Sequence, residues 1–361
     1  MNQYVAPFAA ILLAACSTLK PPIAGMQAVD ALIQPGEKHF EHLWQITSGG
    51  QNAEGYWNRS GDRLSFQYTN DNSEHGQVWP CDRIFVTDPA GGPPQIVSSG
   101  KGVTTCSYFL PNGHEVLFAS TQQWQSECPP KADHSKGYTW SVHPEYDIWI
   151  HDLDTQAERR ITEEWGYDAE ATVSPLGDSI VFTSSRSGDI ELWTCDLEGK
   201  NLKQVTHQLG YDGGAFFSHD GKRLVFRCTE FSAEHRAAEE ATYRELLGEW
   251  KVRPQNMELY VANADGSARS QVTHLGGASF APYFFVNDKR IIFSSNYLDP
   301  KKRNFDLFAI DADGKQLETI TTYDGFDSFP MFSPDGKFLV FASNRGGRVA
   351  GETNLFLAQW K

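Results

Sequence analysis

The sequence has little positive charge and no long hydrophobic run after its first residues. Its 31 lysines and arginines are outnumbered by 46 aspartates and glutamates, which leaves a formal net charge of −15 at pH 7. Such a charge repels phosphates and anionic lipid headgroups, and no run of basic residues relieves it. A nucleic-acid partner is therefore not expected. No later apolar run reaches the roughly 20 residues that span a bilayer, so we expect the body of the chain to stay in water.

The first residues have the form of an export signal. An apolar run over residues 6–15 is too short to span a bilayer and ends in small residues before Cys16. The letters LAAC at residues 13–16 resemble the bacterial lipoprotein box, in which the signal is cut before the cysteine and the cysteine is acylated. Unlike that pattern, no lysine or arginine precedes the apolar run, and a plainly secreted protein is the alternative. The resemblance implies lipidation at Cys16, and Ser17 implies sorting to the outer membrane, with the protein facing the periplasm.

We therefore expect a signal peptide at residues 1–15, a lipidated cysteine and tether at residues 16–42, and a folded domain at residues 43–361. Prolines at positions 21, 22 and 35 support a tether. Cysteine is scarce, with six residues in the chain, which fits an oxidising compartment without forming a disulfide framework. With Cys16 acylated, at least one of the others stays unpaired unless it bridges to another chain.

A repeated segment dominates the rest of the sequence. The stretch FPMFSPDGKFLVFASN at residues 329–344 has five near-copies, and each reads as two strands joined by a tight two-residue turn. The second turn residues are Gly61, Gly113, Gly177, Gly221, Asp288 and Gly336. A third and a fourth strand follow most copies, and one extra fourth strand, LWQIT at residues 43–47, precedes the first hairpin. Pairing this extra strand with the last strand would close a ring and remove free edges. The predicted fold is all-β, a six-bladed β-propeller with four-stranded blades.

The sequence SPDGK at residues 333–337, an apolar strand and then ASNR at residues 342–345 resemble the TolB-like propeller repeat. The resemblance covers about residues 43–360. It implies a protein of the bacterial envelope. TolB itself carries an α/β domain before its propeller, and only a short segment separates Cys16 from the repeats. The role of TolB in the Tol-Pal envelope machinery therefore does not carry over whole.

Almost all insertions fall on one face of the predicted ring. Strand directions alternate within a blade, so loops between second and third strands share a face with loops that join one blade to the next. We call this the decorated face and expect it to be the working face. The blade 4 insertion should be helical from Ser232 to Gly248, and its apolar stripe should pack on the rim or grip a partner. The blade 2 insertion can overhang the mouth of the axial tunnel.

The decorated face also carries cysteines and histidines. Cys81, Cys106 and Cys128 fall on it, so one disulfide among them is plausible, with Cys81 to Cys128 slightly preferred. In the blade 2 insertion, Asp133, His134 and His143 could hold a metal, but their spacing fits no known ligand pattern.

A set of polar residues lies nine positions before the second turn residue of each copy. These residues are Asn52, Thr104, Asp168, Asp212, Ser279 and Asp327. They are candidates to bind a ligand at the tunnel mouth, together with Tyr167 and Tyr211, and the three aspartates could hold Ca²⁺ or Mg²⁺. The alternative, which we favour, is that they accept backbone hydrogen bonds or tie neighbouring blades together. No cofactor is required by the sequence.

No catalytic motif accompanies this fold. A Gly-x-Ser-x-Gly nucleophile elbow with its hydrolase domain is missing, and the nearest approach, at residues 277–281, falls in a propeller loop. We therefore predict no catalytic residues and a membrane-anchored periplasmic scaffold that binds a protein or peptide through the decorated face. The alternative is a periplasmic hydrolase or lyase that acts on a peptide or saccharide through the three aspartates and His134.

Overall fold

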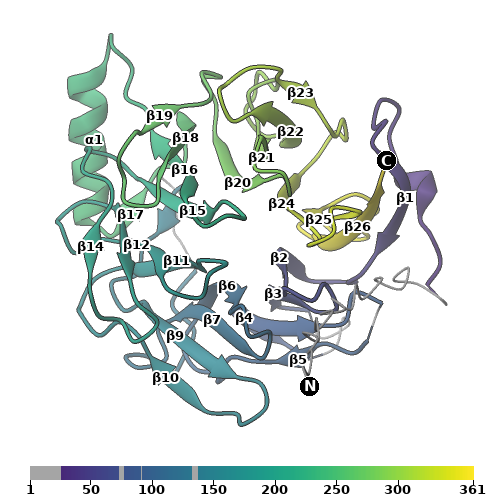
Figure 1. The fold of residues 1–361 in the computed structure, drawn as a ribbon, viewed down its shortest axis with the longest axis horizontal. Helices are drawn as coiled ribbons and strands as arrows, with labels where there is room; N and C mark the ends of the chain where they lie inside the picture. The colour runs from purple at the N-terminus through teal and green to yellow at the C-terminus, as the bar shows by residue number, and fades with distance from the viewer. Residues whose placement is uncertain (1–25, 73–76, 91, 132–136) are drawn as a thin grey trace, which may run out of the picture.

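The computed structural model describes residues 26–72, 77–90, 92–131 and 137–361. Within them, six four-stranded antiparallel sheets surround a central axis, as Figure 1 shows, and this confirms the predicted six-bladed propeller. The innermost strand of each sheet faces the axis, and the helix α1 (Arg236–Gly248) lies outside the ring. No helix in the described part of the chain is long and apolar enough to cross a membrane.

The blades follow one another in chain order, each running from the axis outward. The strands of blades 1 to 3 are β2 (Gln51–Trp57), β3 (Leu64–Asn70), β4 (Trp79–Thr87) and β5 (Gln95–Ile96); β6 (Thr104–Phe109), β7 (Glu115–Ser120), β9 (Asp147–Asp152) and β10 (Glu158–Arg160); and β11 (Asp168–Val173), β12 (Ile180–Ser184), β13 (Glu191–Cys195) and β14 (Lys203–Gln204). The strands of blades 4 to 6 are β15 (Gly213–Phe217), β16 (Arg223–Thr229), β18 (Met257–Asn263) and β19 (Ser270–Gln271); β20 (Ser279–Phe284), β21 (Arg290–Ser295), β22 (Asp306–Asp311) and β23 (Glu318–Thr319); and β24 (Asp327–Phe332), β25 (Phe338–Ser343), β26 (Asn354–Trp360) and β1 (Phe40–Gln45).

The two ends of the chain meet in the last blade. Strand β1 pairs antiparallel with β26, with Leu43 opposite Ala358 and Trp44 opposite Leu357, and Figure 1 shows the two strands side by side. Ile46 extends the pairing by donating its backbone N–H to Leu355 at 2.8 Å. The predicted closure is confirmed, and β26 has a partner on both of its edges while β1 forms the outermost strand of blade 6.

One aromatic position repeats in the second strand of every blade. The six phenylalanines are exposed by 0–1%, and they are Phe66, Phe118, Phe182, Phe226, Phe293 and Phe341. In several blades the ring stacks on an aromatic residue of the third strand, as in Phe341 and Phe356, whose centroids lie 6.0 Å apart. Burying each such side chain contributes about 1.5–3 kcal/mol, which explains why the repeat keeps the same residue type.

The hairpin turns are longer than the two residues that the sequence predicts. In blade 1 the N–H of Asn58 bonds to the carbonyl of Arg63, and the N–H of Gly61 bonds to Asn58, which encloses a four-residue loop. Gly61 has φ of 71°, and Asp288 occupies the equivalent place in blade 5 with φ of 56°. A type I turn followed by a left-handed residue accounts for the glycine, and aspartate tolerates the same conformation.

The blade 4 insertion of the decorated face forms a helix of its own. Helix α1 begins at Arg236 rather than beside Ser232, because the Ser232 hydroxyl first accepts the N–H of His235 and orders a turn ahead of the helix. Tyr243 is buried, and Leu247 and Trp250 pack on the core of the neighbouring blades, so the apolar stripe covers the rim as one of the two predicted alternatives requires.

Part of the segment expected to be a tether packs on the ring. It includes the short helix η1 (Asp30–Leu32) and ends near Glu37, whose carboxylate lies 3.0 Å from the guanidinium of Arg345. The same guanidinium lies 2.6 Å from Asp327, and all three side chains are fully buried. A buried arginine needs paired carboxylates, so this triad attaches the segment to blade 6.

Candidate functional site

The propeller axis contains a pocket of about 730 Å³ that opens toward the decorated face. Its walls come from the inner strands of the six blades and from residues 138–143 of the blade 2 insertion. We call it the central pocket. Its volume is typical of pockets that hold small ligands or short segments of a partner.

The central pocket is closed at its inner end by large side chains. Tyr56, Tyr108, Phe216 and Tyr283 contact one another edge to face or tilted, with ring centroids 5.3–6.1 Å apart. Each lies four residues after one of the six predicted polar residues, on the axial side of its strand. The axis is therefore a blind pocket at this level and not an open tunnel.

The six predicted tunnel-mouth residues do not line this pocket. All are exposed by no more than 2%, and each lies within one residue of the start of an inner strand. Asp168 bonds to Arg186 at 2.7 Å, and Asp327 bonds to Arg345 at 2.6 Å. Each of these ion pairs joins two residues of the same blade, Asp168 with Arg186 in blade 3 and Asp327 with Arg345 in blade 6.

The other four predicted residues also make contacts inside or between blades. Asp212 lies 3.9 Å from Arg269, and the Asn52 amide donates to the Thr353 carbonyl at 2.9 Å. Thr104 donates to the Asp82 carbonyl of the preceding blade at 2.9 Å. Ser279 bonds to the hydroxyl of Ser295 at 3.0 Å. The structural alternative, blade bracing, therefore describes their geometry.

The residues that face the pocket lie two positions further along each inner strand. They are Glu54, Cys106, Glu170, Gly214, Ala281 and Phe329. All six have positive φ, between 50° and 60°, and we call them the collar. In blade 3, Ala169 pairs with Thr183 and the next pair is Thr172 with Val181. Two residues of β11 therefore lie opposite one residue of β12, which is a β-bulge.

A bulge of this kind turns a side chain toward the axis. Non-glycine residues in the left-handed region cost about 1 kcal/mol or more each and gather at functional sites. Only Gly214 of the six collar residues is a glycine, so residue type did not reveal the bulge in the sequence. The repeat nevertheless contained this information, because each collar residue lies seven positions, rather than nine, before the second turn residue of its copy.

The collar divides the pocket into two chemically different sides. Blades 1 to 3 contribute ionisable residues, and blades 4 to 6 contribute glycine, alanine and phenylalanine. Of the predicted pocket residues, Tyr167 and Tyr211 do line it. Tyr211 accepts a hydrogen bond from Arg227 at 2.8 Å, and Arg227 also pairs with the collar residue Glu170.

Arg227 neutralises one of the pocket carboxylates. Glu170 further accepts hydrogen bonds from Thr183 at 2.9 Å and from the Gly214 N–H at 3.0 Å. The guanidinium of Arg227 lies over the ring of Trp140, 5.3 Å from its centroid. Glu170 and Arg227 therefore form a satisfied pair that holds the pocket wall in place.

The surroundings of Glu54 differ from those of Glu170. The pKa of Glu54 is raised to about 8, chiefly by burial. The nearby carboxylates of Glu170 and Asp82 add to the rise, while a hydrogen bond from Cys106 and the charge of Arg227 oppose it. The same burial raises the pKa of Asp82, although Thr69 donates a hydrogen bond to it. A carboxyl group with such a pKa in a cleft is a functional-site candidate that no motif in the sequence announced.

A roof over the mouth joins two insertions. Strand β8 (Trp140–Ser141) of the blade 2 insertion pairs antiparallel with β17 (Lys251–Val252) of the blade 4 insertion. A disulfide between Cys81 and Cys128, the pair that the sequence slightly favours, ties the blade 2 insertion to blade 1. The insertion thus overhangs the pocket as predicted. Cys106 is a free thiol on the collar.

Comparisons with known proteins agree with this geometry. Residues 250–350 match the family described as TolB beta propeller domain. The solved structure of TolB from Acinetobacter baumannii is 19% identical, with a TM-score of 0.54, and the alignment covers 86% of this chain and 65% of that one. A putative TolB from Agrobacterium tumefaciens is 15% identical, with a TM-score of 0.58, covering 88% and 96% of the two chains. Residues 250–350 are therefore similar to a TolB-type propeller repeat, and the two solved structures share the fold of the chain.

An enzyme also shares the fold of this propeller. An oligogalacturonate lyase in complex with manganese is 16% identical, with a TM-score of 0.53, and the alignment covers 88% of this chain and 80% of the lyase. Identities at this level indicate the fold alone. A search of curated protein sequences found no match.

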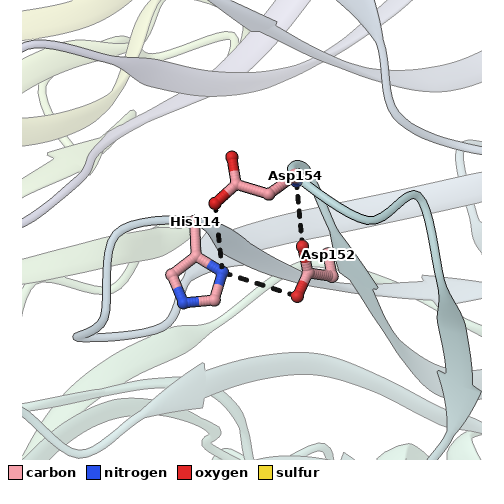
Figure 2. Close-up of side chains that lie close together, drawn as sticks. All are labelled: His114, Asp152 and Asp154. Atoms are coloured by element: carbon pink, nitrogen blue, oxygen red, sulfur yellow. Dashed lines mark hydrogen bonds and ion pairs between the residues drawn. The ribbon is translucent and has the colours of Figure 1, made fainter.

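The central pocket offers few metal ligands among its described lining residues. Among its described lining residues the only histidine is His143, and Asp133 and His134 lie outside the described residues, as does Cys16. Figure 2 shows the one group of described side chains close enough to share an ion, on the opposite face: His114 Nδ1 lies 3.5 Å from Asp152 and 4.0 Å from Asp154. Asp152 there accepts the Asp154 N–H at 2.9 Å, as in an ordinary aspartate turn.

Proposed function

We propose that this propeller is an envelope protein that binds a segment of a protein or peptide partner in its central pocket. The observation that carries the proposal is a pocket of about 730 Å³, closed at its inner end and lined by a strained collar on the decorated face. Acylation of Cys16 would hold the chain at the outer membrane, so that the partner is met in the periplasm.

The surface around the pocket supports a macromolecular partner. Large side chains remain exposed on the decorated face: Trp124 by 48%, Tyr138 by 63% and Trp165 by 58%. Trp124 and Trp165 contact each other at 5.5 Å, edge to face. Of the three, Tyr138 lines the central pocket, and exposed aromatic residues on one face are typical of surfaces that bind a partner.

The enzyme alternative gains no support from its three aspartates, and its fourth residue, His134, lies outside the described residues. Asp168 and Asp327 are paired with buried arginines, and Asp212 is buried away from the pocket. None of the three lines the central pocket, and the arginine closest to each belongs to the same blade. We therefore propose binding, not catalysis, as the function of this site.

The test is affinity capture of cross-linked partners from envelope extract by the full chain, with two matched variants. Tyr138→Ala removes an exposed ring from the pocket wall, and Leu176→Ala removes a side chain that is 66% exposed in a hairpin turn on the opposite face. We expect a stoichiometric partner that Tyr138→Ala loses and Leu176→Ala keeps. Equal loss or equal retention by the two variants would exclude the pocket face as the binding surface.

A further inference from the structure

The central pocket presents a carboxyl side and a phenyl side to whatever enters it. We define the carboxyl side by Glu54 and Asp82 of blade 1, and the phenyl side by Phe280, Phe305, Phe326 and Phe329 of blades 5 and 6. Because blade 6 adjoins blade 1 in the closed ring, the two sides are neighbouring parts of the pocket wall (Figure 1). A ligand that fills the pocket must therefore satisfy both.

The carboxyl side has acceptors but no cation of its own. Among the described residues, the carboxylate of Glu54 has a single hydrogen-bond partner, the thiol of Cys106 at 3.6 Å, and no lysine or arginine lies within ion-pair distance. Arg227 is already committed to Glu170 and Tyr211. A buried carboxylate is stabilised only when a cation or several donors reach it.

The phenyl side is a continuous aromatic surface. Phe280 lies 5.2 Å from Phe305 and 5.7 Å from Phe329, and Phe305 lies 5.9 Å from Phe326, measured between ring centroids. Trp140 of the roof extends this surface, with its ring 6.2 Å from Phe280. Such a surface favours an apolar group and can also face a cation.

We propose that the central pocket binds a primary ammonium group that carries an apolar substituent, with the ammonium on Glu54 and the substituent on the phenyl side. This inference rests on the proposed function and names the chemistry of the segment that is bound. Two sources supply that chemistry in a peptide: a free amino terminus with an apolar first side chain, or a lysine beside an apolar residue.

Binding of an ammonium group should be linked to ionisation of Glu54. Its pKa of about 8 means that the carboxyl group is mostly protonated in the empty pocket at pH 6, whereas the ammonium pairs with the carboxylate. The titratable and charged groups that face Glu54 are Tyr56, Asp82, Cys106, Tyr146, Glu170 and Arg227. Since binding releases a proton, affinity should rise by up to about tenfold per pH unit toward pH 8.

The experiment is calorimetric titration of the full chain with three probes. They are Phe-Ala-Ala amide, its N-acetylated form, and N-acetylated Phe-Ala-Lys amide. We expect at least one amine probe to bind about tenfold or more tightly than the acetylated peptide without lysine, because a charge-assisted hydrogen bond is lost in the latter. Binding of only the first probe identifies the amino terminus as the source, and binding of the third identifies lysine.

Two variants distinguish a specific role of Glu54 from a general effect of the negative charge of the protein. Glu54→Gln should remove the preference for amines and the rise in affinity between pH 6 and 8. Glu198→Gln, which changes an exposed glutamate in a turn of the opposite face, should keep both. The proposal is overturned if the acetylated probe without lysine binds as well as the amines, or if no probe binds at millimolar concentration.

These outcomes are independent of the capture experiment. Retention of a partner that Tyr138→Ala loses, together with failure of the amine probes, would overturn only this inference. Binding of the amines without a partner in envelope extract would leave the chemistry of the pocket standing and reject the proposed function.

Discussion

Replacing Glu54 by glutamine should change how the stability of the propeller depends on pH. The pKa of this carboxyl group lies near 8 in the folded protein, against an ordinary value of 4.5. The folded state therefore binds more protons than the unfolded state between those two values. It follows that the wild-type protein loses stability as pH rises through this window, whereas the neutral glutamine does not.

The magnitude follows from the difference between the two pKa values. Each pH unit inside the window costs about 1.4 kcal/mol, so between pH 5 and pH 7.5 the wild type should lose about 3 kcal/mol relative to Glu54→Gln. With an unfolding entropy of about 0.7 kcal/mol/K for a domain of this size, the loss corresponds to about 4 °C in Tm. Other buried carboxyl groups, such as Glu191 and Asp212, are the same in both proteins and cancel from the comparison.

The assay is thermal unfolding of both proteins in matched buffers from pH 5 to pH 8.5. We expect nearly equal Tm values at pH 5 and a more stable variant at pH 7.5. Glu198→Gln serves as the control, since its exposed carboxylate should leave the pH profile of the wild type unchanged. A Tm difference between wild type and Glu54→Gln that does not vary with pH would refute the reasoning, as would a less stable variant at pH 7.5.

Two further predictions concern the contacts that hold the ring and its roof. Arg345→Met should lower the free energy of unfolding by about 3–5 kcal/mol, because Glu37 and Asp327 are then buried without a cation. Adding Glu37→Gln and Asp327→Asn to this variant should restore part of the lost stability. An unchanged Tm of Arg345→Met would contradict the role of the triad. Cys81→Ser should lower the free energy of unfolding by up to about 4 kcal/mol, because the disulfide with Cys128 closes a loop with a sequence separation of 47 residues. A reductant should lower the Tm of the wild type to that of the variant. A wild-type Tm that the reductant leaves unchanged would argue against the disulfide.

The repeat made the fold predictable from sequence. Six copies with one phenylalanine at the same place require six equivalent packing positions, and the extra strand at residues 43–47 requires a partner at the end of the chain. Both features are local or periodic, so they can be recognised in the sequence without knowledge of the tertiary structure. The start of α1 was predicted less well, because the Ser232 hydroxyl caps a turn and not the helix itself.

The candidate site was only partly predictable. Tyr167 and Tyr211 line the pocket as expected, whereas the polar residue that follows each of them, Asp168 or Asp212, is buried away from it. Strand alternation alone does not tell which residue faces the axis when a bulge inserts an extra residue. The bulge in turn depends on the neighbouring strands and not on the residue type at the collar.

The sequence by itself determined the number of blades, the closure of the ring and the face that bears the insertions, because these depend on hydrophobic periodicity and turn chemistry repeated along the chain. Only the tertiary structure decided which side chains meet inside the ring. Glu54, Asp82 and Phe329 come from segments far apart in the sequence, and their proximity arises when the first and last blades close around one axis.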